Sequence, residues 1–170
     1  MNEQMKLKPK GGSLFQELLV FIKERLRLSE DDAVMIALWI MATYVVRVFE
    51  TFPILVPVGG FGSGKTTVLR VVEAVSCRPF LLGEYFSPAS VYWNLTRWKT
   101  AILDEFSALE GRQKNVASTL LRGRWHWAAK TTHARRVFKY HGPTTVALDD
   151  LNQKTALISR LLLIRMEDSK

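Results

Sequence analysis

The amino-terminal part of the chain has the hydrophobic spacing of two helices. Apolar residues at positions 14, 15, 18, 19, 22 and 26 predict an amphipathic helix over Leu14 to Leu28. Ser29 and the acids at 30–32 then favour the start of a second helix, which runs to about Phe49. Positions 33–46 are apolar or neutral, but these fourteen residues fall short of the roughly 20 needed to span a bilayer. We therefore expect a helix that is buried against a sheet.

Short apolar segments alternate with helical patterns along the rest of the chain. This alternation predicts an α/β fold with a parallel sheet that is covered by helices on both faces. The predicted strands are Ile54–Val58, Arg78–Leu82, Thr100–Leu103, Thr144–Leu148 and Leu161–Met166, and the predicted helices are Lys65–Ser76, Ser87–Trp98, Lys114–Arg122 and Leu151–Ser159. Pro57 cannot donate to a strand ladder, so we expect it at the last position of its strand. Trp125–Trp127 and Arg136–Phe138 predict a hairpin.

The amino-acid composition limits the classes of protein to which this chain can belong. A chain of 170 residues with 48% hydrophobic and 24% charged residues fits one domain with a real core. The single cysteine, Cys77, excludes an internal disulfide and a cysteine metal site, and favours a reducing, cytoplasmic setting. The three histidines have no acidic or cysteine companions at metal spacing, which argues against zinc. Residues 1–12 are polar and rich in lysine, so we expect a flexible lead and no signal peptide.

Residues 59–67 carry the most informative motif. Gly59, Gly64, Lys65 and Thr66 fit the pattern G-x-x-x-x-G-K-T between an apolar segment and a helical one. Glycines let successive N–H groups turn toward phosphate oxygens, and the first turn of the following helix adds its own N–H groups. Lys65 would reach the β- and γ-phosphates, and the Thr66 hydroxyl would hold Mg²⁺. The alternative is a glycine-rich turn that precedes a lysine by chance. We predict ATP and Mg²⁺ as cofactors, bound by Gly59, Gly60, Phe61, Gly62, Ser63, Gly64, Lys65, Thr66 and Thr67.

A second motif follows at the end of the strand predicted over residues 100–103. In enzymes with a phosphate loop, an apolar strand that ends in Asp presents this carboxylate to the Mg²⁺ shell, a role that Asp104 fits. Glu105 would polarise a water molecule for attack on the γ-phosphate. An Asp-Glu pair after an apolar run is also a common surface turn. The metal ligands are therefore predicted as Thr66 and Asp104, with Glu105 as the catalytic base.

The order of the motifs resembles that of the AAA+ and helicase branch of P-loop ATPases. After the loop and Asp104-Glu105 come a polar strand end near Asp149 and then Ser159-Arg160 before a closing apolar strand. Ala156–Leu161 is similar to the leucine-leucine-serine-arginine-phenylalanine segment of replicative helicases such as the minichromosome maintenance proteins. The wider pattern resembles small helicase-like ATPase domains of phages and mobile elements over about residues 33–166, including Phe49–Pro53, Arg78-Pro79 and Ser87–Ala89.

This resemblance implies a fold and further catalytic residues. The fold would be a parallel P-loop NTPase sheet of the AAA+/RecA-like type between helices, with an N-terminal helical pair over residues 14–50, a core over 51–170 and no C-terminal lid. Arg160 would be an arginine finger that reaches the γ-phosphate of a neighbouring subunit, or else a surface arginine that caps a helix. Asp149 or Asp150 would occupy the sensor position that orients the attacking water. This position usually holds Asn, Ser or Thr, so an acid departs from the pattern.

The positive charge is concentrated in one block. The net charge is +8, and residues 111–140 contain eight cations and no acid. Cations interleaved with aromatic residues can bind the phosphates and stack on the bases of single-stranded DNA. In related helicases a hairpin in this stretch points into the central pore. Alternatively, the tryptophans are core residues and the cations form a solvated face. The predicted nucleic-acid contacts are Arg122, Arg124, Lys130, Arg135, Arg136 and Lys139.

Three functions fit the motifs. The first is an ATP-hydrolysing motor, a DNA helicase or translocase that acts on single-stranded DNA as a homo-oligomeric ring, with a hexamer favoured. The second is a nucleotide-dependent assembly or switch ATPase without motor activity. The third is a P-loop kinase, which leaves Asp104-Glu105 and Ser159-Arg160 without a role. All three predict no contact with a membrane.

Overall fold

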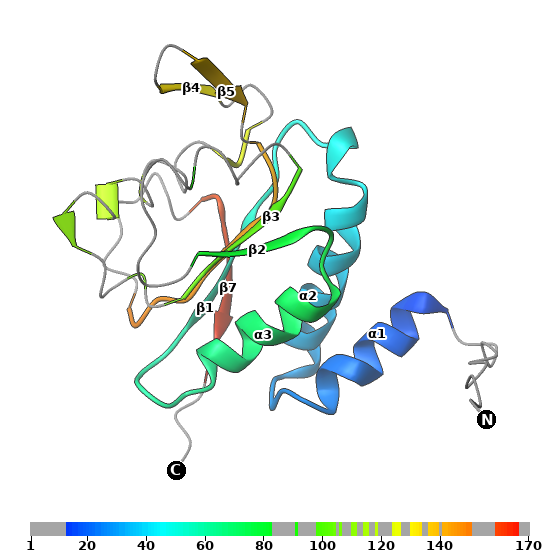
Figure 1. Cartoon of the computed structure of the whole chain (residues 1–170). Coiled ribbons are helices and arrows are strands. Elements are labelled where there is room, and N and C mark those ends of the chain that lie inside the picture. The colour runs from blue at the N-terminus through cyan, green and yellow to red at the C-terminus, as the bar shows by residue number, and fades with distance from the viewer. Residues whose placement is uncertain are drawn as a thin grey trace, which may run out of the picture.

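Parallel strands form the centre of the molecule. The computed structural model describes residues 13–82, 91, 98–104, 106, 110–111, 114–115, 118, 124–126, 130–133, 136–139, 141–150 and 159–166. Within these ranges a five-stranded parallel sheet has the strand order β2-β3-β6-β1-β7 (Figure 1). Its strands are β1 (Ile54–Val58), β2 (Pro79–Leu82), β3 (Thr100–Leu103), β6 (Thr144–Val146) and β7 (Leu161–Arg165). The predicted parallel α/β sheet is confirmed, and each strand overlaps its predicted segment.

Strand β1 is buried on both faces. Ile54 and Val56 pack into one hydrophobic cluster, while Leu55 packs into another on the opposite face. Pro57 is the penultimate residue of β1, so its predicted place at the last position is wrong. The strand tolerates it because the ladder with β6 pairs only residues 54 and 55 of β1. The carbonyl oxygen of Pro57 still accepts a hydrogen bond from the Leu148 N–H at 3.1 Å.

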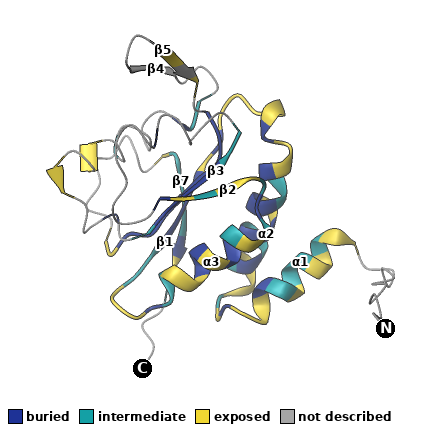
Figure 2. Cartoon of the chain, viewed as in Figure 1, coloured by how far each residue is buried: buried dark blue, intermediate teal, exposed yellow. Residues whose placement is uncertain are grey.

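Three helices cover one face of the sheet. They are α1 (Leu14–Lys23), α2 (Glu30–Tyr44) and α3 (Lys65–Val75), and a short 3₁₀ helix η1 (Val46–Val48) follows α2. Side chains of all three α-helices form one buried cluster with residues of β1 and β7, visible as the dark interior in Figure 2. Ser29 caps α2 as predicted, whereas α1 ends at Lys23, earlier than predicted.

The apolar segment over residues 33–46 is buried in part: α2 ends at Tyr44, and Leu38, Tyr44 and Val45 are exposed. Six side chains of α2 are buried: Ala33, Ile36, Ala37, Trp39, Ile40 and Thr43. The Trp39 Nε1–H donates to the Pro53 carbonyl oxygen at 2.9 Å, which ties α2 to the segment before β1. None of the helices in the described ranges is both long and apolar enough to cross a membrane.

The opposite face of the sheet is described only in part. Val91 and Phe106 pack there against residues of β1, β3 and β6. The predicted helices over 87–98, 114–122 and 151–159 fall for the most part outside the described residues, as do the lead at 1–12 and the predicted covering of this second face.

A separate antiparallel hairpin stands at one end of the sheet. It consists of β4 (Lys130–His133) and β5 (Arg136–Lys139). The predicted hairpin is confirmed, but its first strand is not Trp125–Trp127, because Trp125 accepts a hydrogen bond from the Phe52 N–H at 2.7 Å and His126 bridges to Thr51. The hairpin leads into the amino end of β6, so it lies at the opposite end of the sheet from the loop that follows β1 (Figure 1).

Candidate functional site

The loop between β1 and α3 has a shape that only glycine permits at several positions. Gly62 and Gly64 have φ angles of +79° and +93°, in the left-handed region. A Cβ atom on Gly59 would lie 2.7 Å from the Ser63 Oγ and 2.9 Å from the Met166 Cβ. Gly64 is the N-cap of α3, and no side chain caps this helix. The loop therefore presents the start of α3 in the manner of an anion-binding site.

Lys65 folds back over this loop. Its Nζ donates hydrogen bonds to the carbonyl oxygens of Gly59 at 2.7 Å and Gly60 at 2.6 Å. The same atom lies 3.2 Å from the Asp149 Oδ1, and the Lys65 side chain is 13% exposed. Because Gly59 and Gly60 begin the loop, the ammonium is already held where the motif predicts a phosphate-binding cation.

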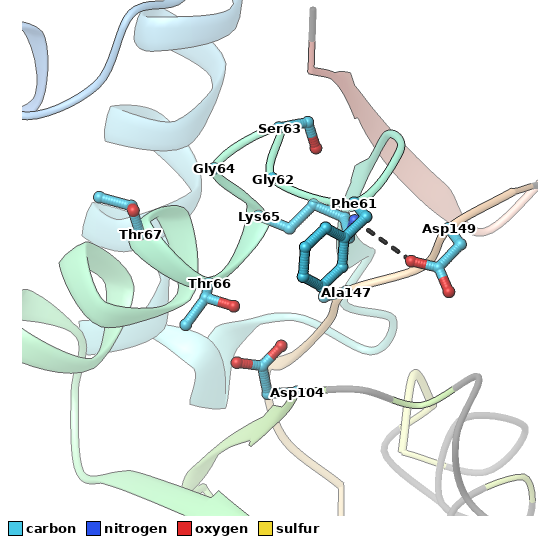
Figure 3. A pocket seen from close by; sticks show the side chains of 10 residues that line it. All are labelled: Phe61, Gly62, Ser63, Gly64, Lys65, Thr66, Thr67, Asp104, Ala147 and Asp149. Carbon is cyan, nitrogen blue, oxygen red and sulfur yellow. Dashed lines mark ion pairs between the residues drawn. The ribbon is translucent and has the colours of Figure 1, made fainter. Parts of the chain in front are cut away.

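Thr66 and Asp104 come together from different elements. Thr66 is in the first turn of α3, and Asp104 directly follows β3. Both line one cavity, and Figure 3 shows their oxygen atoms turned toward the same space. The structure thus brings together the two predicted metal ligands, while Glu105 lies outside the described residues.

These residues surround an open cavity of about 560 Å³ at the carboxyl end of the strands. Ligands of open α/β sheets bind at this end. Asp149 borders the cavity from the end of β6, with 63% of its side chain exposed. Phe61 is fully exposed at the tip of the loop. The lining residues are Phe61, Gly62, Ser63, Gly64, Lys65, Thr66, Thr67, Asp104, Ala147 and Asp149 (Figure 3).

The residues present fit a magnesium-bound nucleotide. Mg²⁺ is usually held by one or two carboxylates together with substrate phosphates, and a hydroxyl is a suitable further ligand. Among the described residues no group of three or more His, Cys, Asp or Glu side chains could hold a metal by itself. The Ser63 Oγ is buried and has no hydrogen-bond partner within the described part of the chain, so this hydroxyl can turn to an oxygen that enters the loop.

Arg160 lies far from the phosphate loop of its own chain. Its carbonyl oxygen accepts a hydrogen bond from the N–H of Ile54, the first residue of β1, at 3.0 Å. Its guanidinium lies 4.1 Å from the centre of the Trp125 ring. Because the loop follows the last residue of β1, Arg160 and the loop are at opposite ends of this strand.

Arg124 does not fit its predicted role as a nucleic-acid contact. The residue is completely buried. Its Nε donates to the Thr144 Oγ1 at 3.1 Å, and its Nη2 donates to the carbonyl oxygens of Pro143, at 3.3 Å, and of Lys99. The guanidinium therefore joins the ends of β3 and β6 at the base of the hairpin. The prediction is wrong for Arg124 because its charge is directed into the protein.

The remaining basic residues divide between the hairpin and undescribed positions. Lys130 and Lys139 are directly opposite one another in the hairpin, and His133 is opposite Arg136. Lys139 and Val137 are exposed. Arg122 and Arg135 lie outside the described residues. The structure thus brings Lys130, Arg136 and Lys139 together on one small antiparallel unit.

Sequence reasoning missed the part that Met166 plays in the site. Met166 follows β7, and its N–H donates to the Val58 carbonyl oxygen at 2.8 Å. A Cβ on Gly64 would lie 3.5 Å from the Met166 Cε, so this side chain supports the loop from the strand next to β1. The only sequence signal is its place after an apolar strand. Without knowing that β7 pairs with β1, this signal does not identify Met166.

Comparisons with known proteins add no family to these observations. The chain matches no protein-family model, and no curated protein has significant similarity to it.

Proposed function

We propose that this protein binds Mg-ATP and hydrolyses it, with the fold of a P-loop NTPase of the AAA+/RecA-like type. The observation that carries the proposal is the position of Lys65, folded over a glycine loop that joins a buried parallel strand to a helix. Strand order supports it as well. Because β6 lies between β1 and β3, the loop, Asp149 and Asp104 follow three adjacent strands at one edge of the sheet.

The proposal gives roles to the polar residues of the cavity and to Glu105 and Arg160. The loop N–H groups and Lys65 bind the β- and γ-phosphates, while Thr66 and Asp104 hold the metal. Bound Mg²⁺ supplies positive charge against which charge develops during phosphoryl transfer. Glu105 takes a proton from the attacking water, and Asp149 orients this water from the end of β6. Arg160 stabilises the transferred phosphoryl group in the site of a neighbouring subunit.

We further propose that ATP hydrolysis drives a helicase or translocase on single-stranded DNA. The hairpin supports this because like charges directly opposite one another destabilise a strand pair, and the Lys130–Lys139 pair is of this kind. A bound phosphate backbone would offset the repulsion between them. The loop and hairpin lie at opposite ends of the sheet, so nucleotide and DNA would bind without competing for space.

One assay separates the candidate functions. ATP turnover is measured with the full chain at increasing single-stranded DNA, with and without Mg²⁺. A motor hydrolyses ATP faster as DNA is added, and needs Mg²⁺. Turnover that does not respond to DNA favours the assembly or switch ATPase, which keeps the same nucleotide site. Failure to bind Mg-ATP at micromolar to millimolar concentration would reject both.

A further inference from the structure

The ammonium of Lys65 makes two hydrogen bonds and one ion pair in this structure. A lysine ammonium has three N–H donors. Two of them go to the Gly59 and Gly60 carbonyl oxygens at 2.7 and 2.6 Å, and the Asp149 Oδ1 forms an ion pair with the ammonium at 3.2 Å. The Lys65 side chain is only 13% exposed. A phosphate oxygen that binds this ammonium therefore competes with these three oxygen atoms for it.

Asp149 is the acceptor most readily displaced. The two carbonyl groups belong to the loop backbone, whereas Asp149 reaches Lys65 from the end of β6 with 63% of its own side chain exposed. Figure 3 shows this carboxylate directed at the ammonium. Displacement leaves an unpaired negative charge close to the incoming phosphates, with Asp104 as a second negative charge on the same cavity.

The net charge of the ligand determines how strongly Asp104 and Asp149 repel it from the cavity. Lys65, Asp104 and Asp149 are the charged residues among those that line the cavity, and together they carry one net negative charge. A metal-free triphosphate adds about four negative charges near neutral pH, and a carboxylate a few ångströms away repels it even when solvent partly screens the charge. A triphosphate that carries Mg²⁺ has two fewer net negative charges, so the carboxylate would repel it less.

We propose that Asp149 makes the site selective for metal-bound nucleotide over free polyphosphate anions, by competing with them for Lys65. In the nucleotide-free protein the carboxylate holds the ammonium. A metal-free anion must displace the Asp149 carboxylate from Lys65 and is then repelled by it. A metal-bound nucleotide also displaces the carboxylate, but its metal ion supplies a positive charge that replaces the ion pair with Lys65. This inference rests on the proposed nucleotide site and explains why an acid stands at the end of β6.

The first test does not depend on nucleotide at all. Wild type and Asp149→Asn are treated with an amine-acylating reagent, and the labelling rate of Lys65 is measured by peptide mass spectrometry. We expect Lys65 to react about three- to fivefold faster in the variant, the scale of an exposed ion pair. Asp31→Asn, on an exposed position of α2, removes an equal charge and should leave the rate unchanged. Equal Lys65 rates in wild type and Asp149→Asn overturn the proposal.

The second test measures selectivity directly. Dissociation constants of inorganic tripolyphosphate and ATP are measured by calorimetry in EDTA and in excess Mg²⁺. In EDTA, Asp149→Asn should bind both anions about five- to tenfold more tightly than wild type, because a partly screened charge is removed. In Mg²⁺, the gain in affinity for ATP should be clearly smaller than the gain in EDTA, because the metal offsets the charge of the carboxylate. Asp31→Asn should resemble wild type in both buffers.

The outcomes separate this inference from the proposed function. If wild type binds Mg-ATP but Asp149→Asn shows the same ratio of affinities with and without Mg²⁺, the selectivity role of Asp149 is wrong and the nucleotide site stands. If neither protein binds ATP or tripolyphosphate under any condition, both proposals are wrong. A faster labelling of Lys65 in that case would still establish the ion pair as a feature of the fold.

Discussion

The Arg124 guanidinium occupies the space that any side chain at position 142 would need. A Cβ on Gly142 would lie 2.6 Å from the Arg124 Nη2 and 2.8 Å from the Lys99 carbonyl oxygen. In addition, the Gly142 N–H donates to the Arg124 carbonyl oxygen at 3.2 Å, and the His141 Nδ1 lies 2.9 Å from the same oxygen. The chain before the hairpin is thereby fixed to the chain after it.

Arg124 should therefore stabilise the fold and not contact DNA. Replacing it by Met keeps the length of the side chain but leaves buried carbonyl oxygens without a donor, which costs about 2–4 kcal/mol of unfolding free energy. Urea denaturation followed by circular dichroism measures this. Lys139→Met, at an exposed position, is the control and should shift stability by less than about 0.5 kcal/mol. Equal stability of the two variants would contradict the structural role.

Lys65→Ala should abolish productive nucleotide binding. The change removes the one cation among the described residues that line the cavity, and with it the charged hydrogen bonds expected to the β- and γ-phosphates. Binding of a fluorescent ATP analogue in Mg²⁺ measures the loss, which we expect to exceed about 100-fold. The matched control is Lys114→Ala, at an exposed residue that does not line the cavity. ATP affinity and turnover like those of wild type in Lys65→Ala would rule out the phosphate loop.

Glu105→Gln should separate binding from hydrolysis. The amide keeps the shape of the side chain but cannot accept the proton of the attacking water, and loss of a catalytic base typically lowers the rate about 10²- to 10⁴-fold. Mg-ATP affinity should stay within about threefold of wild type. Turnover within a few-fold of wild type would mean that Glu105 is a structural turn residue.

The sequence predicts the loop and most strands because these depend on local signals. Glycine and proline bound β1, and its unbroken apolar run is typical of a strand with two buried faces. The position of Pro57 could not be predicted, because the extent of the ladder with β6 is set by a segment far along the chain. The partnership of Lys65 with Asp149 depends likewise on the strand order, which places β6 next to β1.

The basic block shows where local reasoning fails. Arg124 stands in sequence among other cations and carries no local signal that separates it from them, but its acceptors belong to residues 99, 143 and 144. The aromatic Trp125–Trp127 segment has high strand propensity. However, its first residues pair with the segment around residues 51 and 52, and the ladder of the hairpin begins only at Lys130. In both cases, contacts with residues far away in the sequence determine the structure.

Arg160→Ala tests whether subunits share their active sites. Arg160 lies at the opposite end of β1 from the loop, so the proposed finger would act on the nucleotide of a neighbouring subunit. An arginine finger in trans contributes roughly 10³-fold or more to turnover, so the variant should bind ATP but hydrolyse it poorly. Mixing it with Glu105→Gln should restore part of the activity, because some interfaces then combine an intact Glu105 with an intact Arg160.

Two results would contradict the shared site. One is a mixture no more active than its separate components, and the other is a strictly monomeric protein at high concentration in analytical ultracentrifugation. Trp125→Leu is a useful comparison, because it removes the ring over which the guanidinium lies while keeping the charge. The effect of Trp125→Leu on ATP turnover measures how much the contact with the ring helps to position Arg160.

The hairpin should carry the response to DNA. Replacing Lys130, Arg136 and Lys139 with Ala removes the cations that the two strands share. Each lost phosphate contact should lower the slope of log affinity against log salt by about 0.7 for single-stranded DNA. The variant should also lose stimulation of ATP turnover by DNA while its basal turnover persists, because the loop lies at the other end of the sheet. Lys6, Lys8 and Lys10 changed together to Ala remove the same charge and serve as the control. If both triple variants lose affinity and slope equally, only overall charge attracts DNA, and the motor proposal loses the support of the hairpin.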